Sequence, residues 1–362
     1  MLIYNFGSGP GMMPPEVLQQ AQQEMLSCNG SGMSIMEMPF TGADFQQIAD
    51  RARQDLRELL RVPDNFQILF MQGGASAQFS LVPMNLLANN DNPQVDYIDT
   101  GYWSRKAIVE AKRYCNVNVV STCQSQTELN IAKMGSFNPM ASYCHITTNE
   151  TADGIQLHQL PDTGAVPLIA DMSSDFLSRP IDFSRFGLIY AGAQKNIGPA
   201  GLTIVLIRDD LIQEPIATTP SAFSFKVVAD SHGRFNTPLT HAIYMAGLVF
   251  QYFKKIGGIP AIEKLSQVKS QRLYQAIDQT NFYRCLQPVN VRSRMNVCFE
   301  LVNKQLTELF LAMAQKRGLI NLGGHSALGG IRASLYNAMP VAGVEALENF
   351  MSDFELEHQN VV

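Results

Sequence analysis

Short apolar runs alternate with longer amphipathic segments along much of the chain, and this alternation limits the possible folds more than any other feature. Six runs have the length and composition of buried strands: Gln67–Met71, Val95–Asp99, Ser142–Thr147, Val166–Asp171, Phe186–Ala191 and Leu202–Ile207. Apolar residues at helical spacing occupy Pro15–Leu26, Asp44–Leu60, Ser76–Leu87 and Ser104–Tyr114. Strands that alternate with helices form mostly parallel sheets covered on both faces, so we expect an α/β fold.

The pattern changes at Gly257-Gly258, which follows a predicted helix over Thr240–Lys255. Beyond this pair we expect helix, strand, helix, strand and helix, over Ile262–Gln279, Arg294–Glu300, Lys304–Arg317, Gly330–Ser334 and Val341–Glu357. Such an order is typical of a small α+β domain, and a chain of 362 residues usually forms about two domains. We predict an N-terminal segment over residues 1–15, a large domain over 16–257 and a small domain over 258–362.

The composition narrows the functional classes. Charged residues make up 16% of the chain, below the roughly 25% of average soluble proteins, which favours extensive burial and a subunit interface. A net charge of −5 argues against a nucleic-acid partner. The six cysteines lack metal-ligand spacing and are interpreted as reduced thiols. Neither a signal peptide nor an apolar run of about 20 residues is present, so we expect a cytoplasmic protein without a membrane partner.

Polar residues follow each predicted strand, at the edge where a doubly wound sheet binds its ligands. A glycine turn over Gln72–Phe79 leads into a helix whose first amides suit a phosphate group. Trp103, the only tryptophan, follows the second strand, and a polar turn over Thr148–Gly154 follows the third. Each feature alone also has a structural explanation, namely turn geometry, core packing or hydrogen bonding within the loop.

The fourth and fifth strands end in opposite charges, Asp171 and Lys195, and glycines follow Lys195. Charged groups are costly to bury unless they are paired or bound to something. An internal salt bridge is one interpretation. The other is a pyridoxal phosphate site, in which Lys195 forms a Schiff base and Asp171 keeps the pyridine nitrogen protonated.

Longer segments resemble the phosphoserine aminotransferase family of class V aminotransferases over essentially the whole chain. They are Tyr4–Pro10, Ser34–Met38, Tyr97–Trp103, Asn149–Thr151 with Asp153-Gly154, Ser178–Asp182, Ile189–Thr203, Phe235–Pro238 and Arg332–Met339. The resemblance implies the fold type I of pyridoxal-phosphate-dependent transferases, which is aspartate aminotransferase-like. It also implies a ping-pong transaminase of serine biosynthesis that moves an amino group between glutamate or phosphoserine and a 2-oxo acid.

The same resemblance implies roles for the matching positions. Lys195 and Asp171 are the catalytic pair, Trp103 stacks on the cofactor ring and Thr151 binds the phenolic oxygen of the cofactor. The phosphate cradle comprises Gln194 with the amides of Ala75 and Ser76, and no metal is implied. Asn236 and Thr237 match residues that reach the cofactor phosphate from the second subunit, which implies a homodimer with shared active sites. The substrate-binding residues are Arg332, for the α-carboxylate, with His325 and Thr41.

The chain departs from the family at the clamp for the distal phosphate or carboxylate of the substrate. The family has a His-Arg pair, a single arginine and a second His-Arg pair, whereas this sequence has Phe40-Thr41, Ser76 and His325-Ser326. Three arginines and one histidine are therefore replaced by neutral residues. Each lost charged hydrogen bond in such a site is worth about 1.5–3 kcal/mol.

Two explanations of the altered clamp remain open. Arg105, Lys106 or Arg234 rebuild it, or the enzyme is a diverged paralogue that acts on a non-phosphorylated substrate. The loss of three arginines and one histidine from the clamp favours the second explanation. The similarity of the whole sequence to the family leaves a phosphoserine enzyme as the other interpretation. A third hypothesis is a non-catalytic protein that binds pyridoxal phosphate, against which the intact Lys195 and Asp171 argue.

Overall fold

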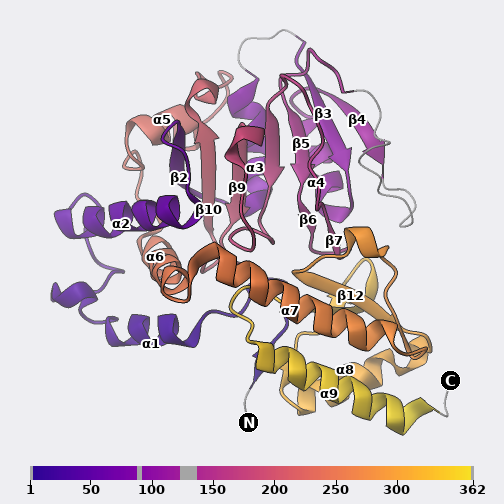
Figure 1. The fold of residues 1–362 in the computed structure, drawn as a ribbon. Coiled ribbons are helices and arrows are strands. Elements are labelled where there is room, and N and C mark those ends of the chain that lie inside the picture. Colours follow the sequence, from indigo (N-terminus) through magenta and orange to yellow (C-terminus); the bar gives the residue numbers. More distant parts are fainter. Residues whose placement is uncertain (1–2, 88–91, 123–136, 360–362) are drawn as a thin grey trace.

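The computed structural model describes residues 3–87, 92–122 and 137–359 (Figure 1). The α-helices of these ranges are α1 (Pro15–Gln23), α2 (Ala43–Leu60), α3 (Gly74–Leu86), α4 (Tyr102–Ala111), α5 (Phe225–Asp230), α6 (Thr240–Lys255), α7 (Gly258–Asp278), α8 (Thr307–Lys316) and α9 (Val341–His358). The strands are β1 (Tyr4–Asn5), β2 (Phe66–Gln72), β3 (Gln94–Asp99), β4 (Asn116–Thr122), β5 (Cys144–Thr147), β6 (Asn149–Glu150), β7 (Ile155–Gln156), β8 (Leu168–Asp171), β9 (Leu188–Gly192), β10 (Leu202–Arg208), β11 (Tyr283–Arg284), β12 (Asn296–Leu301), β13 (Leu319–Ile320), β14 (Gly323–His325) and β15 (Gly329–Ser334).

Within the described residues, a seven-stranded sheet in the order β2-β10-β9-β8-β5-β3-β4 forms the upper part of the molecule in Figure 1. β10 runs antiparallel to both of its neighbours, and the remaining pairs are parallel. The predicted α/β fold with a mostly parallel sheet is confirmed.

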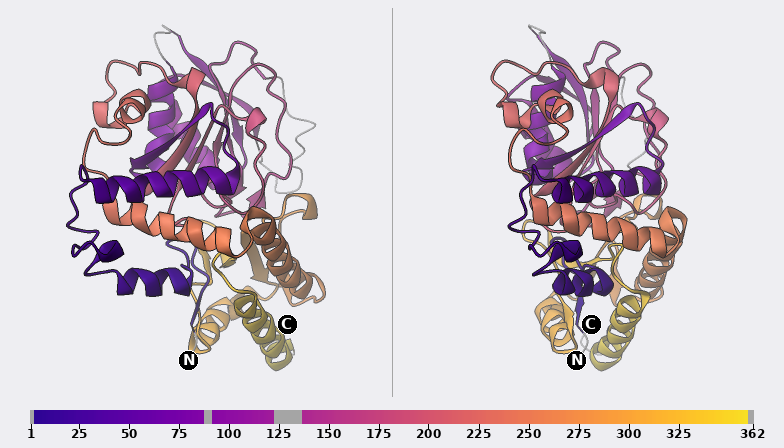
Figure 2. Two further views of the ribbon diagram at one scale, coloured as in Figure 1. Left: turned by 60° about the vertical axis from the view of Figure 1, so that its left-hand side comes forward. Right: turned by 90° about the vertical axis from the view of Figure 1, so that its left-hand side faces the viewer.

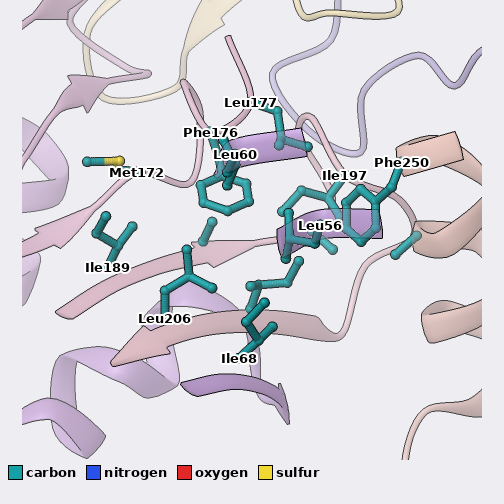
Figure 3. Close-up of a cluster of buried hydrophobic side chains, with 14 of the residues drawn as sticks. Leu56, Leu60, Ile68, Met172, Phe176, Leu177, Ile189, Ile197, Leu206 and Phe250 are labelled. Carbon is teal, nitrogen blue, oxygen red and sulfur yellow. The ribbon is translucent and has the colours of Figure 1, made fainter. Parts of the chain in front are cut away.

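Both faces of this sheet are covered, because neighbouring residues of a strand point to opposite sides. In β9, Leu188 and Tyr190 belong to the core that α3 and α4 cover. Ile189 lies in the other core, together with residues of α2 and α6. Figure 3 shows part of this second core, with Ile189 and Leu206 toward one side of the cluster and Phe250 toward the other. Figure 2 shows α2 and α6 side by side. The predicted cover on both faces is therefore confirmed.

The six predicted strands correspond to β2, β3, β5, β8, β9 and β10, and their ends agree with the prediction to within two residues. β8 begins only after Pro167, because proline has no N–H to donate to a neighbouring strand. Helix α1 ends at Gln23, before the predicted Leu26. The prediction omitted β4, which forms the edge of the sheet beside β3.

A second, antiparallel sheet in the order β11-β12-β15-β14 packs with α7, α8 and α9. Its core includes Val297, Ile331 and Leu347. The N-terminal residues join this part of the molecule, because β1 pairs with β13 and Phe6 lies in the same core. The division of the chain at residues 15 and 257 stays a prediction.

In the described ranges no helix is long and apolar enough to cross a membrane. The cysteines of these ranges are free thiols, namely Cys28, Cys115, Cys144, Cys285 and Cys298. Cys123, which was also predicted to be a reduced thiol, lies outside the described residues.

A buried lysine ties α7 to the chain that follows β15. The Lys269 side chain is 1% exposed, and its Nζ donates hydrogen bonds to the carbonyl oxygens of Leu335, Tyr336 and Met339 at 3.0, 2.6 and 2.9 Å. Burial lowers the pKa of Lys269 to about 7. These bonds fix the segment that leaves β15 just beyond Arg332.

Replacing Lys269 by Met is expected to lower the free energy of unfolding by about 3 kcal/mol. The methionine fills a similar volume but removes the donor of the Leu335 and Met339 carbonyl oxygens, while the Tyr336 carbonyl keeps only its hydrogen bond from the Met339 amide. Urea denaturation measures the change, with Lys264→Met, at an exposed position of the same helix, as the control. Equal stability of the two variants would contradict this account of Lys269.

Candidate active site

The predicted functional residues lie mainly in the turns that follow β2, β3, β5, β8 and β9. Parallel strands bring their carboxyl ends to one edge of the sheet, so these turns meet. Asp171 is the last residue of β8, and Lys195 follows β9, the neighbouring strand. Arg332, on β15 of the second sheet, is close enough for its charge to act on Lys195.

Lys195 is held between two of the predicted cofactor-binding residues. Its Nζ donates a hydrogen bond of 2.7 Å to Thr151 Oγ1 and lies 5.4 Å from the ring centroid of Trp103. Burial lowers the pKa of Lys195, although the negative charges of Asp171 and Glu150 act in the opposite direction. A lowered pKa increases the neutral, nucleophilic fraction of a lysine.

Asp171 is a buried carboxylate, 5% exposed, whose Oδ1 accepts a hydrogen bond of 2.8 Å from the amide of Ser173. Burial raises its pKa, and the charge of Lys195 partly opposes this shift. Among the ion pairs between described residues, none joins Asp171 to Lys195. The interpretation as a closed internal salt bridge is therefore wrong for this structure, and the carboxylate is available to a cation that enters the site.

The turn after β2 places backbone amides at the start of α3. Gly73 has a φ of 100°, which favours glycine, and α3 begins at the next residue. Gly192 lies beside this turn: a Cβ at this residue would be 2.7 Å from Gln194 Oε1 and 3.3 Å from the amide of Ala75. The Gln194 side chain and the Ala75 amide thus approach the same point, whereas the Ser76 side chain is exposed.

Two side-chain atoms at this site are buried without a hydrogen-bond partner among the described residues, Gln194 Oε1 and Trp103 Nε1. Orphaned buried polar atoms are rare and often mark the place of a ligand. A lysine beside an indole, a buried carboxylate and amides at a helix start are the groups that pyridoxal phosphate requires. The residues present fit this cofactor. No cluster of metal-ligating side chains occurs among the described residues.

The predicted substrate-binding residues are only partly brought together. Arg332 is buried, and its Nη2 donates a hydrogen bond of 2.8 Å to Ser8 Oγ. The half-buried His325 ring packs on the ring of Tyr102, the neighbour of Trp103, with 4.3 Å between the ring centroids. Thr41 is exposed, just ahead of α2, and no contact joins it to Lys195 in the described part of the chain.

The candidate replacements for the lost arginines have other neighbours. Arg105 Nε lies 3.0 Å from Asp99 Oδ1, and Lys106 Nζ lies 5.5 Å from the centroid of the Tyr102 ring. Arg234 is exposed, and its Nε donates to the carbonyl of Ser231 at 3.2 Å. Whether these residues replace the clamp stays a prediction.

Asn236 and Thr237 lie on an exposed segment between α5 and α6. The Thr237 carbonyl accepts a hydrogen bond of 2.9 Å from Gln72 Nε2. Within the described residues no contact joins either side chain to Lys195. Their predicted role, which requires a second subunit, stays a prediction.

Several residues whose hydrogen bonds fix the geometry of the site appear in the sequence analysis only within longer segments that resemble the family. Tyr336 donates through its hydroxyl to the Ser8 carbonyl at 2.6 Å, and Asn196 accepts a bond of 2.9 Å from the amide of Asn337. Glu150 accepts bonds from the first turn of α4, which carries Trp103. In the sequence these residues stand out only as polar residues inside those segments, and polarity alone does not predict which distant residue each one contacts.

Comparisons with known proteins agree with this geometry. Residues 3–347 match the family Aminotransferase class-V. The chain is 50% identical over 357 residues to a phosphoserine aminotransferase of Pseudomonas putida, covering 98% of both chains. A solved phosphoserine aminotransferase of Bacillus circulans subsp. alkalophilus has a TM-score of 0.95 at 40% identity and covers 99% of both chains. A phosphoserine aminotransferase from Trichomonas vaginalis with bound pyridoxal phosphate has a TM-score of 0.92 at 37% identity, covering 97% of this chain and all of the other.

Replacing Lys195 by Ala is expected to abolish the visible absorbance of the Schiff base with pyridoxal phosphate and to lower turnover by at least about 10³-fold. The reason is that the substitution removes the only amine that contacts Thr151 and Trp103 in the described residues. Absorption spectra of the purified proteins measure the first effect. Lys255→Ala, at an exposed position of α6, serves as the control. An absorbing, active Lys195→Ala variant would show that another residue carries the cofactor.

Proposed function

This chain belongs to the class-V aminotransferase family and is a pyridoxal-phosphate-dependent transaminase, and we propose that it transfers an amino group between an amino acid and a 2-oxo acid. Glutamate and phosphoserine are the first substrates to test, because relatives of about 50% identity are named phosphoserine aminotransferases. The observation that supports the proposal most directly is Lys195, held by Thr151 and Trp103 beside the buried Asp171.

In this proposal, different residues of the site bind different parts of the cofactor. The amides of Ala75 and Ser76 and the side chain of Gln194 hold its phosphate. Trp103 stacks on its ring and Thr151 binds its phenolic oxygen. Asp171 binds its pyridine nitrogen, whose positive charge offsets the cost of burying the carboxylate.

Bound pyridoxal phosphate supplies an electron sink that weakens the Cα–H bond of the substrate, and it retains the amino group between the two half-reactions. Lys195 Nζ removes the proton from the substrate Cα and later returns a proton, which requires the neutral amine that burial favours. Thr151 Oγ1 holds that amine when it is not engaged. Arg332 binds the α-carboxylate, and Ser8 fixes the orientation of its guanidinium.

The same Lys195 serves the donor and the acceptor, so the first 2-oxo acid must leave before the second one binds. This is the ping-pong order. We place the enzyme in the cytoplasm, in amino-acid metabolism and in particular serine biosynthesis.

We also propose that the enzyme is a homodimer whose subunits share their active sites. Asn236 and Thr237 are exposed in one chain, where their side chains have no contact with Lys195 among the described residues. A second subunit would bring this segment to the cofactor phosphate of its neighbour.

Shared sites predict complementation between two defective subunits. Co-expression of Lys195→Ala with the Asn236→Ala/Thr237→Ala double variant is expected to restore activity, up to about a quarter of wild type, because hybrid dimers contain one intact site. Activity of the purified mixture, compared with that of each variant alone, measures the effect. A mixture whose activity equals the sum of the two separate proteins would contradict shared sites.

A second candidate function is transamination of a substrate without a phosphate group. Arg332 is buried in the site, whereas Thr41, Ser76 and Ser326 are neutral and exposed. Arg105 and Lys106 lie against Asp99 and Tyr102, as described above. A phosphorylated substrate carries about two more negative charges than a neutral amino acid. In this second candidate, the neutral side chains at these three positions replace the arginines that would bind those charges.

Single-turnover half-reactions separate the two candidates. With phosphoserine, glutamate and small neutral amino acids, loss of the cofactor absorbance identifies the donor. If the substrate lacks phosphate, neutral amino acids react faster than phosphoserine, and Ser76→Arg raises the rate for phosphoserine by about tenfold, the value of one charged hydrogen bond.

The opposite result, in which phosphoserine is preferred by the wild type and Ser76→Arg adds nothing, would support the phosphoserine enzyme. Ser80→Arg, one turn further along α3, controls for added positive charge. If no amino acid of the panel removes the absorbance, the non-catalytic hypothesis replaces both candidates.

A further inference from the structure

The first turn of α4, which carries Trp103, is held by two carboxylates: Glu150, the last residue of β6, and Asp153, in the turn between β6 and β7. Glu150 Oε2 accepts a hydrogen bond of 2.8 Å from the amide of Trp103, and Glu150 Oε1 accepts one of 2.8 Å from the amide of Ser104. Asp153 Oδ2 accepts one of 2.9 Å from the amide of Tyr102. Three successive amides of the helix start therefore bind side chains from a distant part of the sequence.

The fit of these carboxylates leaves little freedom. Glu150 is completely buried, and its Oε1 also accepts a hydrogen bond of 3.1 Å from Thr100 Oγ1. A Cβ at Gly101 would lie 2.6 Å from Asp153 Oδ2 and 2.9 Å from Glu150 Cδ, so only glycine leaves room for both groups. The contacts hold the helix start against the turn as one unit.

The same turn also sets the position of Lys195. Thr151, the residue directly after Glu150, accepts the hydrogen bond from Lys195 Nζ. Glu150 thus fixes the indole and Thr151 fixes the amine from adjacent positions of one turn. The distance of 5.4 Å between Lys195 Nζ and the Trp103 ring depends on both.

We propose that Glu150 is a positioning residue for the cofactor: as a carboxylate it holds the Trp103 ring in register with Lys195 by anchoring the first turn of α4. The proposal rests on the proposed stacking of Trp103 on pyridoxal phosphate. Glu150 itself contacts neither the cofactor nor the substrate in this assignment, and it acts through Trp103.

The anchor depends on the ionisation of Glu150, because a protonated carboxyl group has one acceptor oxygen fewer. Burial and, to a smaller extent, the negative charge of Asp153 raise the pKa of Glu150 to about 7, against the opposing effect of the hydrogen bonds from the amides of Ser104 and Trp103. The other charged or titratable groups whose charges interact with Glu150 are Arg105 on α4, Tyr190 on β9 and Lys195. The anchor is therefore complete above about pH 7 and weakens as the pH falls through that value.

Trp103 is the only tryptophan of the chain, so the intrinsic tryptophan fluorescence reports on this ring alone. The test titrates the full-length protein with pyridoxal phosphate and follows the quenching of that fluorescence, for wild type and Glu150→Gln, at several pH values. We expect Glu150→Gln to weaken binding about tenfold above the pKa of Glu150, the value of one charge-assisted hydrogen bond. The ratio of the two dissociation constants is expected to fall toward one below that pKa, where both side chains are neutral.

Two further variants sharpen the test. Glu110→Gln, on the same helix, removes a carboxylate that bonds to Ser80 Oγ and is expected to bind the cofactor like wild type. Asp153→Asn removes the neighbouring negative charge, so the pH at which cofactor binding weakens is expected to move downward in a protein that keeps Glu150. This second measurement decides the matter even if Glu150→Gln folds poorly.

The positioning role is overturned if the ratio of the dissociation constants of Glu150→Gln and wild type stays near one, or if it is raised equally at every pH. An unchanged midpoint in Asp153→Asn does the same. Pyridoxal phosphate that binds by absorbance without quenching Trp103 overturns the stacking on which this role rests, yet leaves the transaminase function standing. Failure of that function would appear separately, as an absence of turnover with a fully quenched Trp103.

Discussion

The burial of two opposite charges at the ends of neighbouring strands is the constraint on which the site depends. Asp171 ends β8 and is buried, whereas Lys195 follows β9 and is half-buried. Each shifts the pKa of the other toward the charged form, against the effect of burial. The lysine donates to Thr151 instead of closing an ion pair, so the two groups remain separately available to a ligand between them.

The strands that place these groups could be predicted because each is a continuous apolar run buried on both faces. β4 was not predicted: Asn116 and Asn118 alternate with valines at the edge of the sheet and weaken the apolar signal. The two-residue strands β1 and β13 leave no periodicity to detect, yet their pairing carries the N-terminal residues to the second sheet. That pairing brings Ser8 to Arg332 across most of the chain.

The residues of the candidate site were likewise predicted from the sequence only in part. Lys195, Asp171 and Trp103 are visible in the sequence because a charge or a lone indole after an apolar strand is unusual. Glu150 was not assigned a role, because a carboxylate that anchors a helix start 46 residues earlier produces no local pattern. Lys269 was missed for a similar reason: its three carbonyl partners lie 66 to 70 residues further along the chain.

The residues proposed to carry out the reaction are different from the residues at the positions of the distal clamp. Lys195, proposed to move the proton, and Asp171, proposed to bind the pyridine nitrogen, have pKa values set by burial and by each other's charge. The clamp positions Thr41, Ser76 and Ser326 are exposed, and a change of charge at an exposed position costs the fold little. Arginines can therefore be lost there without disturbing the sheet edge, the Trp103 anchor or the amine.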